Sequence, residues 1–392
     1  MPLLALLLSY ILLILTLLPQ PQLLVHSMSH SSSTGSDMPK NKNPHPEIQY
    51  ATNGNIVWKD GEEEKTVYSV PTQMNYVTSD TIHPKIVRDS TGSDAGIQNC
   101  HWDPVTVHVK NARCSTTKLT LDNHGMELIE NTPPQLMDGN NINFLDSHQV
   151  LNEYYPHCEQ LLYQQLQQKS HNEVALVKAF DHNVRMSQNN KINNDNSGKS
   201  NTHVQPSIGV VHGDYTQQSG PKRLMDLSQP PKINDVYKDM LASSSSSLLD
   251  PSLVKEAIEG KRRFSFINVW RNIDIENPIS EHPLACIDSS TVSENDLRIF
   301  KIHYPDRIGQ NYFSIHNPNH CWYYYPKMLH SEALLIKQWD SFGDLATTTT
   351  TRNTNVSTLA IHSAFADPST SLNSLPRKSI EVRCVVIWEK ES

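Results

Sequence analysis

The sequence predicts a mainly β protein with flanking helices, an α+β arrangement around an antiparallel sandwich or barrel. Short segments rich in branched and aromatic residues recur along the chain, and turn formers bound them. These segments do not alternate with helices in a regular strand–helix–strand rhythm, which argues against a parallel sheet. With 392 residues and 37% hydrophobic residues, the chain is long enough to bury a large core.

The chain begins with MPLLALLLSYILLILTLL, which predicts a targeting segment. Residues 3–18 would reach roughly 24 Å as a helix, at about 1.5 Å per residue, which is short of the roughly 30 Å of a bilayer interior. We therefore expect a signal peptide over residues 1–27, with an uncleaved signal-anchor as the alternative. Either one predicts the secretory pathway: the ER lumen, secretion, or anchoring by this segment, which would be the chain's only membrane contact.

Polar, low-complexity stretches divide the rest of the chain. Residues 28–65 contain mostly Ser, Asn, Pro and Lys at their start, which predicts a flexible linker, with folding beginning near Val57. We expect residues 66–392 to form a single domain. Three further polar stretches are too low in complexity to pack and are expected to be surface inserts of that domain, near 186–203, 241–250 and 345–358.

Two helices and five strands are predicted between the inserts. Apolar residues spaced three and four apart predict a helix over 150–168, which Pro156 either opens or kinks. The segment 331–339, SEALLIKQW, predicts a second helix with Ser331 as its amino-terminal cap. Branched and aromatic residues predict strands over 174–180, 208–211, 264–270, 312–315 and 379–388.

Charge and cysteine spacing argue against nucleic-acid binding and against a structural zinc site. The net charge is −8, and the densest basic cluster is only Lys261-Arg262-Arg263, so we expect no binding of nucleic acid. The six cysteines include no Cys-x-x-Cys pair, so a structural zinc site is not expected.

A His-x-Asp pair follows the apolar run SIGVV, at His212 and Asp214. Composition alone predicts about two His-x-Asp/Glu triplets, and six occur, so context must decide among them. Residues two apart in a strand point to the same side, and non-haem iron oxygenases need two histidines and a carboxylate on one face of the metal. The triplet at His101 and Asp103 lacks such a preceding run, so we interpret it as structural.

A third ligand should be a histidine on a distant strand, followed by an arginine that can clamp a carboxylate. His362 is followed by Arg377-Lys378-Ser379. Other Arg-x-Ser triplets begin at residues 88, 113, 185 and 263, but no second histidine separates Asp214 from the last of these. His330 and Arg383 are the nearest rivals for the two roles.

A series of ordered segments resembles one known family. The segments VHGDYTQQSGPKR, FSFINVWR, PLACIDSSTV, NPNHCWYYYPKM, EALLIKQWDS, HSAFADP and PRKSIEVR are similar to the AsaB/CmcJ-like hydroxylase/desaturase family. Upstream, LDNHGMELIENTP, EYYPHCEQLL and KAFDHNVR fit the same family, so the resemblance runs from about residue 66 to the end.

The resemblance implies a double-stranded β-helix, or jelly-roll, core and an oxygenase dependent on Fe(II) and 2-oxoglutarate. Dioxygen and a small molecule, often a specialised metabolite, would be its substrates. It implies that His212, Asp214 and His362 hold iron, and that Arg377 with Ser379 holds the far carboxylate of 2-oxoglutarate. Hydroxylation and desaturation are not distinguished.

Several assignments stay open on the sequence alone. Asn268 and Arg271 either line the pocket or form a hydrogen-bond network at a strand end. We interpret the group around Asp181 as a structural ion-pair cluster and the aromatic run 322–325 as core. Two other functions are considered: a non-catalytic secreted β-helix protein that binds a small molecule or metal, and a methyltransferase-associated protein. The second lacks support, because no glycine-rich strand-to-helix turn is present.

Overall fold

The computed structural model describes residues 47–50, 56–60, 63–88, 94–135, 141–168, 173–186, 204–205, 209–232, 235–241, 247–346, 356–371 and 374–390. The expected signal peptide over 1–27 lies outside these residues, as do most of the three expected surface inserts. No helix in the described part of the chain is long and apolar enough to cross a membrane.

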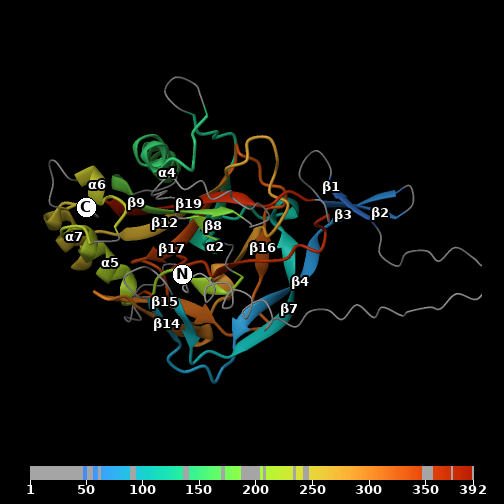
Figure 1. The fold of residues 1–392 in the computed structure, drawn as a ribbon, viewed down its shortest axis with the longest axis horizontal. Helices are drawn as coiled ribbons and strands as arrows, with labels where there is room; N and C mark the ends of the chain where they lie inside the picture. The colour runs from blue at the N-terminus through green and yellow to red at the C-terminus, as the bar shows by residue number, and fades with distance from the viewer. Residues whose placement is uncertain are drawn as a thin grey trace, which may run out of the picture. The chain divides into compact units, whose positions relative to one another are not determined.

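The described chain is mainly β, as the sequence predicts, and most of its strands belong to two sheets (Figure 1). The six-stranded sheet has the order β10 (Val204–Gln205), β9 (Val174–Met186), β19 (Lys378–Trp388), β12 (Phe264–Asn272), β17 (Ala333–Asp340) and β8 (Met126–Ile129). The ten-stranded sheet has the order β4 (Ser69–Val77), β7 (Trp102–Asn111), β16 (Trp322–Tyr324), β13 (Leu284–Ile287), β18 (His362–Ala364), β11 (His212–Gly213), β15 (Ile308–Ser314), β14 (Leu297–His303), β5 (Lys85–Arg88) and β6 (Asp94–Gln98).

Both sheets are mixed and not purely antiparallel, because β10 runs parallel to β9, β5 to β14, and β7 to β16. A separate three-stranded antiparallel sheet contains β1 (Glu47–Tyr50), β2 (Ile56–Asp60) and β3 (Glu63–Val67). These three strands lie largely within residues 28–65, where we expected a linker. The low apolar content of that stretch gave no strand signal before Val57.

The helices are α2 (Leu121–His124), α3 (Ser147–Gln149), α4 (Tyr155–Gln167), α5 (Ser219–Leu227), α6 (Lys238–Leu241) and α7 (Pro251–Ile258). The predicted helix over 150–168 is confirmed, with a π-helical turn over Val150–Tyr154 leading into α4. Pro156 stands at the start of α4, where the absence of a backbone N–H is tolerated. Helix α4 covers β9 and β19 (Figure 1).

The predicted helix over 331–339 is wrong, because this segment forms strand β17. All eight residues of β17 are buried, since β12 and β8 flank it and both of its faces are covered. A short apolar run of this kind suits a buried strand as well as a helix, and periodicity alone does not separate the two. Packing in the sheet outweighs the helix propensity of Ala and Leu.

The predicted strands over 264–270 and 379–388 are confirmed as β12 and β19, which pair in antiparallel register. The strand predicted over 174–180 is also confirmed, and β9 continues from it to Met186. The strand predicted over 312–315 coincides with the end of β15. Of the strand predicted over 208–211, residue 208 lies outside the described residues; within 209–211 Val210 makes an isolated bridge, and β11 begins at His212.

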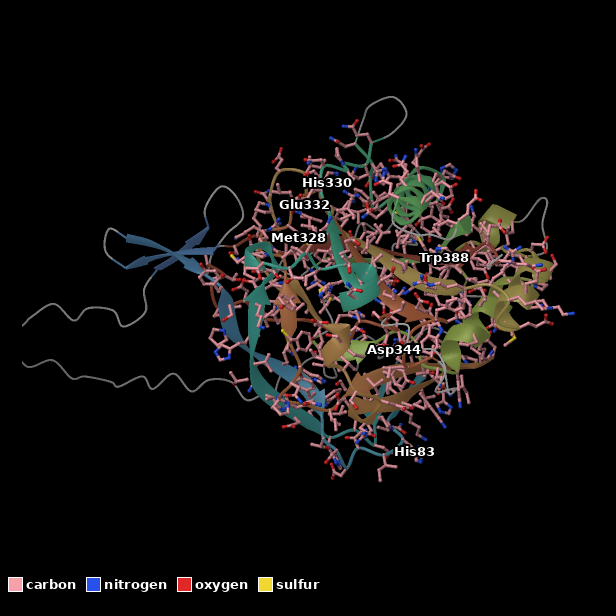
Figure 2. The ribbon with its side chains drawn as sticks, turned by 180° about the vertical axis from the view of Figure 1, so that it is seen from behind. His83, Met328, His330, Glu332, Asp344 and Trp388 are labelled. Atoms are coloured by element: carbon pink, nitrogen blue, oxygen red, sulfur yellow. The ribbon has the colours of Figure 1, made fainter. Side chains whose placement is uncertain are left out.

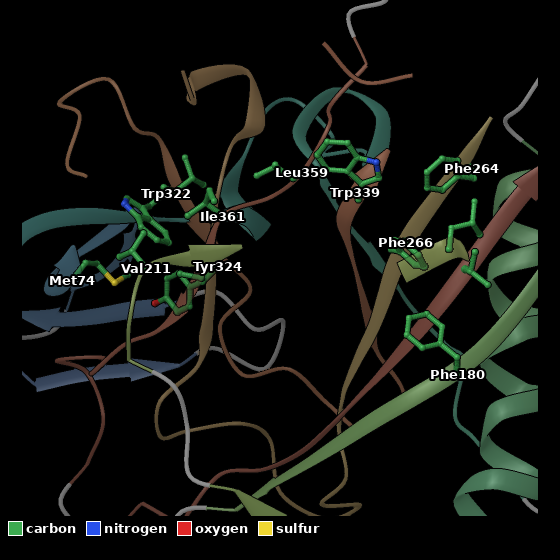
Figure 3. Close-up of a cluster of buried hydrophobic side chains, with 14 of the residues drawn as sticks. Met74, Phe180, Val211, Phe264, Phe266, Trp322, Tyr324, Trp339, Leu359 and Ile361 are labelled. Carbon is green, nitrogen blue, oxygen red and sulfur yellow. The ribbon is translucent and has the colours of Figure 1, made fainter. Parts of the chain in front are cut away.

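A hydrophobic cluster joins the inner faces of the two large sheets (Figure 3). Met74, Trp322 and Tyr324 come from the ten-stranded sheet, and Phe264 and Phe266 come from the six-stranded sheet. On the other face of the six-stranded sheet, a second cluster packs β12, β17 and β19 against α4. The aromatic run 322–325 is core, as interpreted, because Trp322, Tyr324 and Tyr325 are buried.

Candidate metal centre

Two histidines lie side by side on neighbouring strands of the ten-stranded sheet. His212 of β11 is the direct cross-strand partner of His362 of β18. Their ring centroids are 4.4 Å apart, and both residues are buried. Residues opposite each other in an antiparallel pair project to the same face of the sheet, so the two imidazoles meet at one point.

Asp214 completes a three-residue cluster with these histidines. It follows His212 by two residues, and its Oδ1 lies 3.8 Å from His212 Nε2. One ligand atom from each of His212, Asp214 and His362 lies within 4.8 Å of the others. The structure thus brings together the three residues that the sequence nominated as metal ligands.

Backbone carbonyls orient both imidazoles for metal binding. Nδ1 of His212 lies 2.7 Å from the Val210 carbonyl oxygen, and Nδ1 of His362 lies 3.0 Å from that of Ala360. A carbonyl can only accept, so each Nδ1 must carry a proton, and in the neutral imidazole Nε2 then keeps its lone pair for a metal. A metal-ligating histidine is commonly fixed in this way by its other ring nitrogen, so the two side chains fit a metal.

Electrostatics gives His212 and Asp214 the protonation states that a metal needs. Burial, with a smaller contribution from His362, lowers the pKa of His212 to about 4, so its imidazole is neutral at pH 7. Burial alone would raise the pKa of Asp214, but Arg383 and the two histidines hold it well below its usual range. A neutral imidazole and an ionised carboxylate are the forms that bind metal ions.

A cavity of about 740 Å³ opens at the cluster between the two sheets. The ten-stranded sheet supplies a largely apolar wall that includes Ile86, Ile97, Phe300, Ile302 and Phe313. The six-stranded sheet supplies a polar wall that includes Asp181, Asn183, Arg185, Glu381 and Arg383. The volume is within the range of small-molecule sites, roughly 300–1,000 Å³.

Arg377 also lines this cavity, just before β19. One guanidinium nitrogen, Nη1, donates to the His282 carbonyl oxygen, and the group lies over the Trp270 ring at 5.7 Å. Its Nε is buried and has no hydrogen-bond partner among the described residues. Burial and the nearby Arg185 lower the pKa of Arg377 to about 9. A buried arginine with an unused donor is suited to binding a carboxylate.

Ser379, within β19, lies two residues after Arg377. Its hydroxyl is buried and likewise has no partner in the described part of the chain. A buried polar atom without a partner costs roughly 1–3 kcal/mol, so it is uncommon unless a ligand or water satisfies it. The donor set of Arg377 and Ser379 therefore fits the far carboxylate of 2-oxoglutarate.

Asn268 contacts the metal centre, but it does not line the cavity. Its amide nitrogen donates to Asp214 Oδ2 at 3.3 Å. Arg271 lies on the opposite face of β12, towards α4, because it is an odd number of residues from Asn268. Its guanidinium donates to the Tyr154 hydroxyl, the His330 carbonyl and Thr132 Oγ1 and contacts His157 Nε2. The structure therefore places Arg271 in a hydrogen-bond network and not in the pocket.

The rival residues have other partners. His330 lies beside Met328 and Glu332, ahead of β17 (Figure 2), and its Nδ1 contacts the Asn272 carbonyl oxygen at 2.9 Å. Arg383 lines the cavity, but its guanidinium is already bonded to carboxylates, so it is less suited than Arg377 to a ligand's carboxylate. His101 is exposed, and its side chain lies 3.5 Å from the Asp80 carboxylate.

Sequence reasoning did not nominate Glu381 or Gln338. Glu381 lines the cavity, and Gln338 Oε1 accepts from the backbone N–H of Asp214 at 3.3 Å. The available signal for Glu381 was its alternation with apolar residues in β19, which places it on the face of Ser379. No local signal identifies Gln338, because the sequence around it favours a helix as much as a strand.

Comparisons with known proteins agree with this geometry. A family model described as an oxidoreductase/YMDC permease-like domain matches residues 74–240 and 228–387. An uncharacterized protein in the dcmA 3′ region of Methylophilus leisingeri is 36% identical over 188 residues, covering 48% of this chain and 80% of that protein. The hydroxylase/desaturase efuI of Hormonema carpetanum is 25% identical over 308 residues, covering 76% of this chain and 88% of that protein.

A solved structure has a similar fold. The iron and alpha-ketoglutarate-dependent endoperoxidase NvfI superposes with a TM-score of 0.56 at 17% sequence identity. The match covers 83% of this chain and 99% of that protein. At this level of identity the likeness shows a shared fold.

Proposed function

Because this chain belongs to the YMDC/AsaB-like hydroxylase/desaturase family, we propose that it is an Fe(II)/2-oxoglutarate-dependent oxygenase that hydroxylates or desaturates a small organic molecule. The observation that carries the proposal is that the metal centre and Arg377 line one cavity, with the buried, unpaired hydroxyl of Ser379 two residues after Arg377. His212, Asp214 and His362 would hold Fe(II), and Arg377 with Ser379 would hold the far carboxylate of 2-oxoglutarate. When bound, the iron and 2-oxoglutarate would supply the dioxygen chemistry that removes hydrogen from carbon.

The chain's own residues would orient the reactants. The carbonyls of Val210 and Ala360 keep Nε2 of each histidine available, and Asn268 holds the outer oxygen of Asp214. Arg377 would set the position of the cosubstrate through a charge-assisted hydrogen bond, and Trp270 fixes its guanidinium from one side. Preorganised ligands of this kind do not have to move when the reactants bind.

The two walls of the cavity suggest the kind of substrate. The apolar wall would cover a carbon skeleton, and Asn183 with the charged side chains opposite could bond to hydroxyl or carbonyl oxygens. We therefore propose an oxygen-bearing specialised metabolite. The wall around Phe300 and Phe313 would also exclude water from the reacting carbon.

The test of the function is an anaerobic titration of the full chain with Fe(II) and then with 2-oxoglutarate. We expect the visible metal-to-ligand charge-transfer band that forms when 2-oxoglutarate chelates iron. In His212→Ala, iron binding should weaken at least about 100-fold, since one of three ligands is lost, and the band should disappear. His330→Ala, which removes a histidine outside the cavity, should keep the band.

Absence of the charge-transfer band in the parent protein would contradict 2-oxoglutarate as the cosubstrate. Iron binding without the band would then favour a protein that binds a metal or small molecule without turnover.

We also propose that residues 1–27 direct the chain into the secretory pathway. Fusing these residues to a fluorescent reporter tests this, and a cytosolic reporter would contradict it.

A further inference from the structure

One guanidinium in the cavity is shared by three carboxylates. Arg383 donates from Nε to Asp214 Oδ2 at 3.4 Å, from Nη1 to Asp181 Oδ2 at 3.0 Å, and from Nη2 to Glu381 Oε1 at 3.1 Å. Its side chain is only 15% exposed. Each nitrogen of the guanidinium therefore has its own carboxylate partner, in a site largely removed from water.

Two of these carboxylates are potential metal ligands that the centre does not use. Asp181 and Glu381 line the same cavity as His212, Asp214 and His362. Carboxylate oxygens are the ligands that Ca²⁺ and Mg²⁺ prefer, whereas imidazole suits iron and its neighbours in the transition series. If Asp181 and Glu381 were free to turn, the cavity would offer an oxygen-rich site.

The third carboxylate, Asp214, is held so that it presents one oxygen. Its Oδ2 accepts from Arg383 Nε at 3.4 Å and from Asn268 Nδ2 at 3.3 Å. Its Oδ1 faces His212 Nε2. A metal at the cluster would thus meet two imidazole nitrogens and a single carboxylate oxygen, with further positions left open.

We propose that Arg383 is a positioning residue that keeps the metal centre at two nitrogens and one oxygen, and so makes it select iron-like ions over Ca²⁺. Arg383 does this by keeping Asp181, Glu381 and Oδ2 of Asp214 hydrogen-bonded to its guanidinium, so that these oxygens do not coordinate the metal. The inference rests on the metal centre of the proposed function and is independent of whether 2-oxoglutarate binds there. Arg185 lies near Glu381 and Asp214 and would restrain Glu381 in part when Arg383 is replaced.

The test is a competition between two metal ions in the full chain without 2-oxoglutarate. Co²⁺ stands in for Fe(II), because it resists oxidation and its visible absorption reports its coordination. The measured quantity is the ratio of the Ca²⁺ to the Co²⁺ dissociation constant. A ratio cancels the general effect of removing one positive charge, which raises the affinity for both ions.

In Arg383→Gln we expect this ratio to fall at least about tenfold, with a changed Co²⁺ spectrum. In Arg383→Lys the charge is kept, but a single ammonium group does not hold three carboxylates in fixed geometry, so a fall of about threefold is expected. If Arg383→Gln fails to fold, Arg383→Lys carries the test. Adding Glu381→Gln to Arg383→Gln should return the ratio towards that of the parent, because a released ligand is removed.

Arg263→Gln is the matched control. Arg263 is 14% exposed and bonds to the carboxylates of Asp340 and Asp122, but it does not line this cavity. Its replacement should lower stability and leave the ratio unchanged within about twofold.

An unchanged ratio in both Arg383 variants would overturn the inference. If the Fe(II)/2-oxoglutarate charge-transfer band forms but the Ca²⁺/Co²⁺ ratio is unchanged in the variants, only the role of Arg383 is contradicted. If the ratio falls but the band does not form, only the proposed cosubstrate is contradicted. If the parent bound no Co²⁺, neither proposal would stand.

Discussion

The two faces of the six-stranded sheet differ in what they carry, although the same strands build both. On the inner face, the first half of β19 carries the polar residues Ser379, Glu381 and Arg383, whereas Val385 and Ile387 further along join the hydrophobic cluster between the sheets. On the helix side, Ile380 and Val382 pack with β12 and α4. Successive residues of a strand point to opposite faces. Alternate residues of β19 therefore face the cavity and the core under α4. Substitutions on the two faces should therefore have separable effects.

The largest effect is expected on the helix side, at Arg271. This side chain is fully buried and donates to the Tyr154 hydroxyl and to the His330 carbonyl. Arg271→Met fits a similar volume but leaves those acceptors unbonded, so we expect a loss of about 3–5 kcal/mol in the free energy of unfolding. Urea denaturation measures it.

The contrast between the faces requires that Arg271→Met leave the cavity intact. In the folded fraction, the 2-oxoglutarate titration should match that of the parent protein. A change in half-saturation without a change in stability would place Arg271 in the pocket after all, as one of the two sequence interpretations had it.

The second effect is expected on the cavity side, at Arg377. Arg377→Gln removes the charge that would bind the far carboxylate of 2-oxoglutarate. A hydrogen bond to a charged group contributes about 1.5–3 kcal/mol, so the half-saturating concentration should rise roughly 10- to 100-fold. The charge-transfer titration measures this concentration, and Fe(II) affinity should not change.

Arg113→Gln is the control for Arg377. Arg113 is also mostly buried and pairs with Glu332 at 2.8 Å, but it does not line the cavity. If Arg113→Gln raised the half-saturating concentration as much as Arg377→Gln, the effect would reflect general destabilisation and not carboxylate binding.

The third effect is a pH dependence of stability that belongs to the helix side. Burial, and secondarily Arg271, lowers the pKa of His157 to about 4 from an ordinary value near 6.5. The unfolded chain then binds a proton that the folded chain does not, so the stability contributed by His157 is complete above pH 6.5. It is lost as the pH falls from 6.5 towards 4.

We expect this loss to be about 1–2 kcal/mol for His157, because the side chain keeps some exposure. Urea denaturation at pH 7 and pH 4.5 gives the free energy of unfolding that each protein loses between the two pH values. The loss in the parent minus the loss in His157→Gln is the contribution of His157. Equal losses in the two proteins would mean that the proton is taken up elsewhere.

The sequence identifies the two faces of a strand only where one face is polar. In β19, apolar residues alternate with Ser379, Glu381 and Arg383, so both the strand and its faces can be predicted. In β12, all nine residues are buried, and the pattern does not say that Asn268 and Arg271 point in opposite directions. The same physics explains β17, where burial on both faces gave a continuous apolar run that also suited a helix.

Long-range register limits prediction of the site in a different way. Local pattern placed His212 and Asp214 together, because they are two residues apart. That His362 lies opposite His212 depends on the pairing of β11 with β18, which no local pattern encodes. The Arg377-Lys378-Ser379 triplet that follows His362 pointed to this partner, and the order of the family-like segments agreed with it. The guanidinium that three carboxylates share joins β9, β19 and the end of β11, and residue spacing does not reveal it.

The smallest effect compares two buried serines. The hydroxyls of Ser379 and Ser265 both lack a partner among the described residues, and both side chains are almost fully buried. Ser379 follows Arg377 on the cavity side, whereas Ser265 borders a separate small pocket near Arg263. Replacing either with Ala removes an unsatisfied hydroxyl, so the free energy of unfolding without ligand should stay the same or rise slightly.

Only Ser379→Ala should weaken 2-oxoglutarate binding, by at least about threefold, because one hydrogen bond to the far carboxylate is lost. Ser265→Ala should not change it. A variant that is at least as stable as the parent but binds the cosubstrate less well would show that the unsatisfied hydroxyl is kept for the ligand. If both variants bound 2-oxoglutarate equally well, Ser379 would belong to the core. The polar, ligand-facing part of β19 would then begin at Glu381.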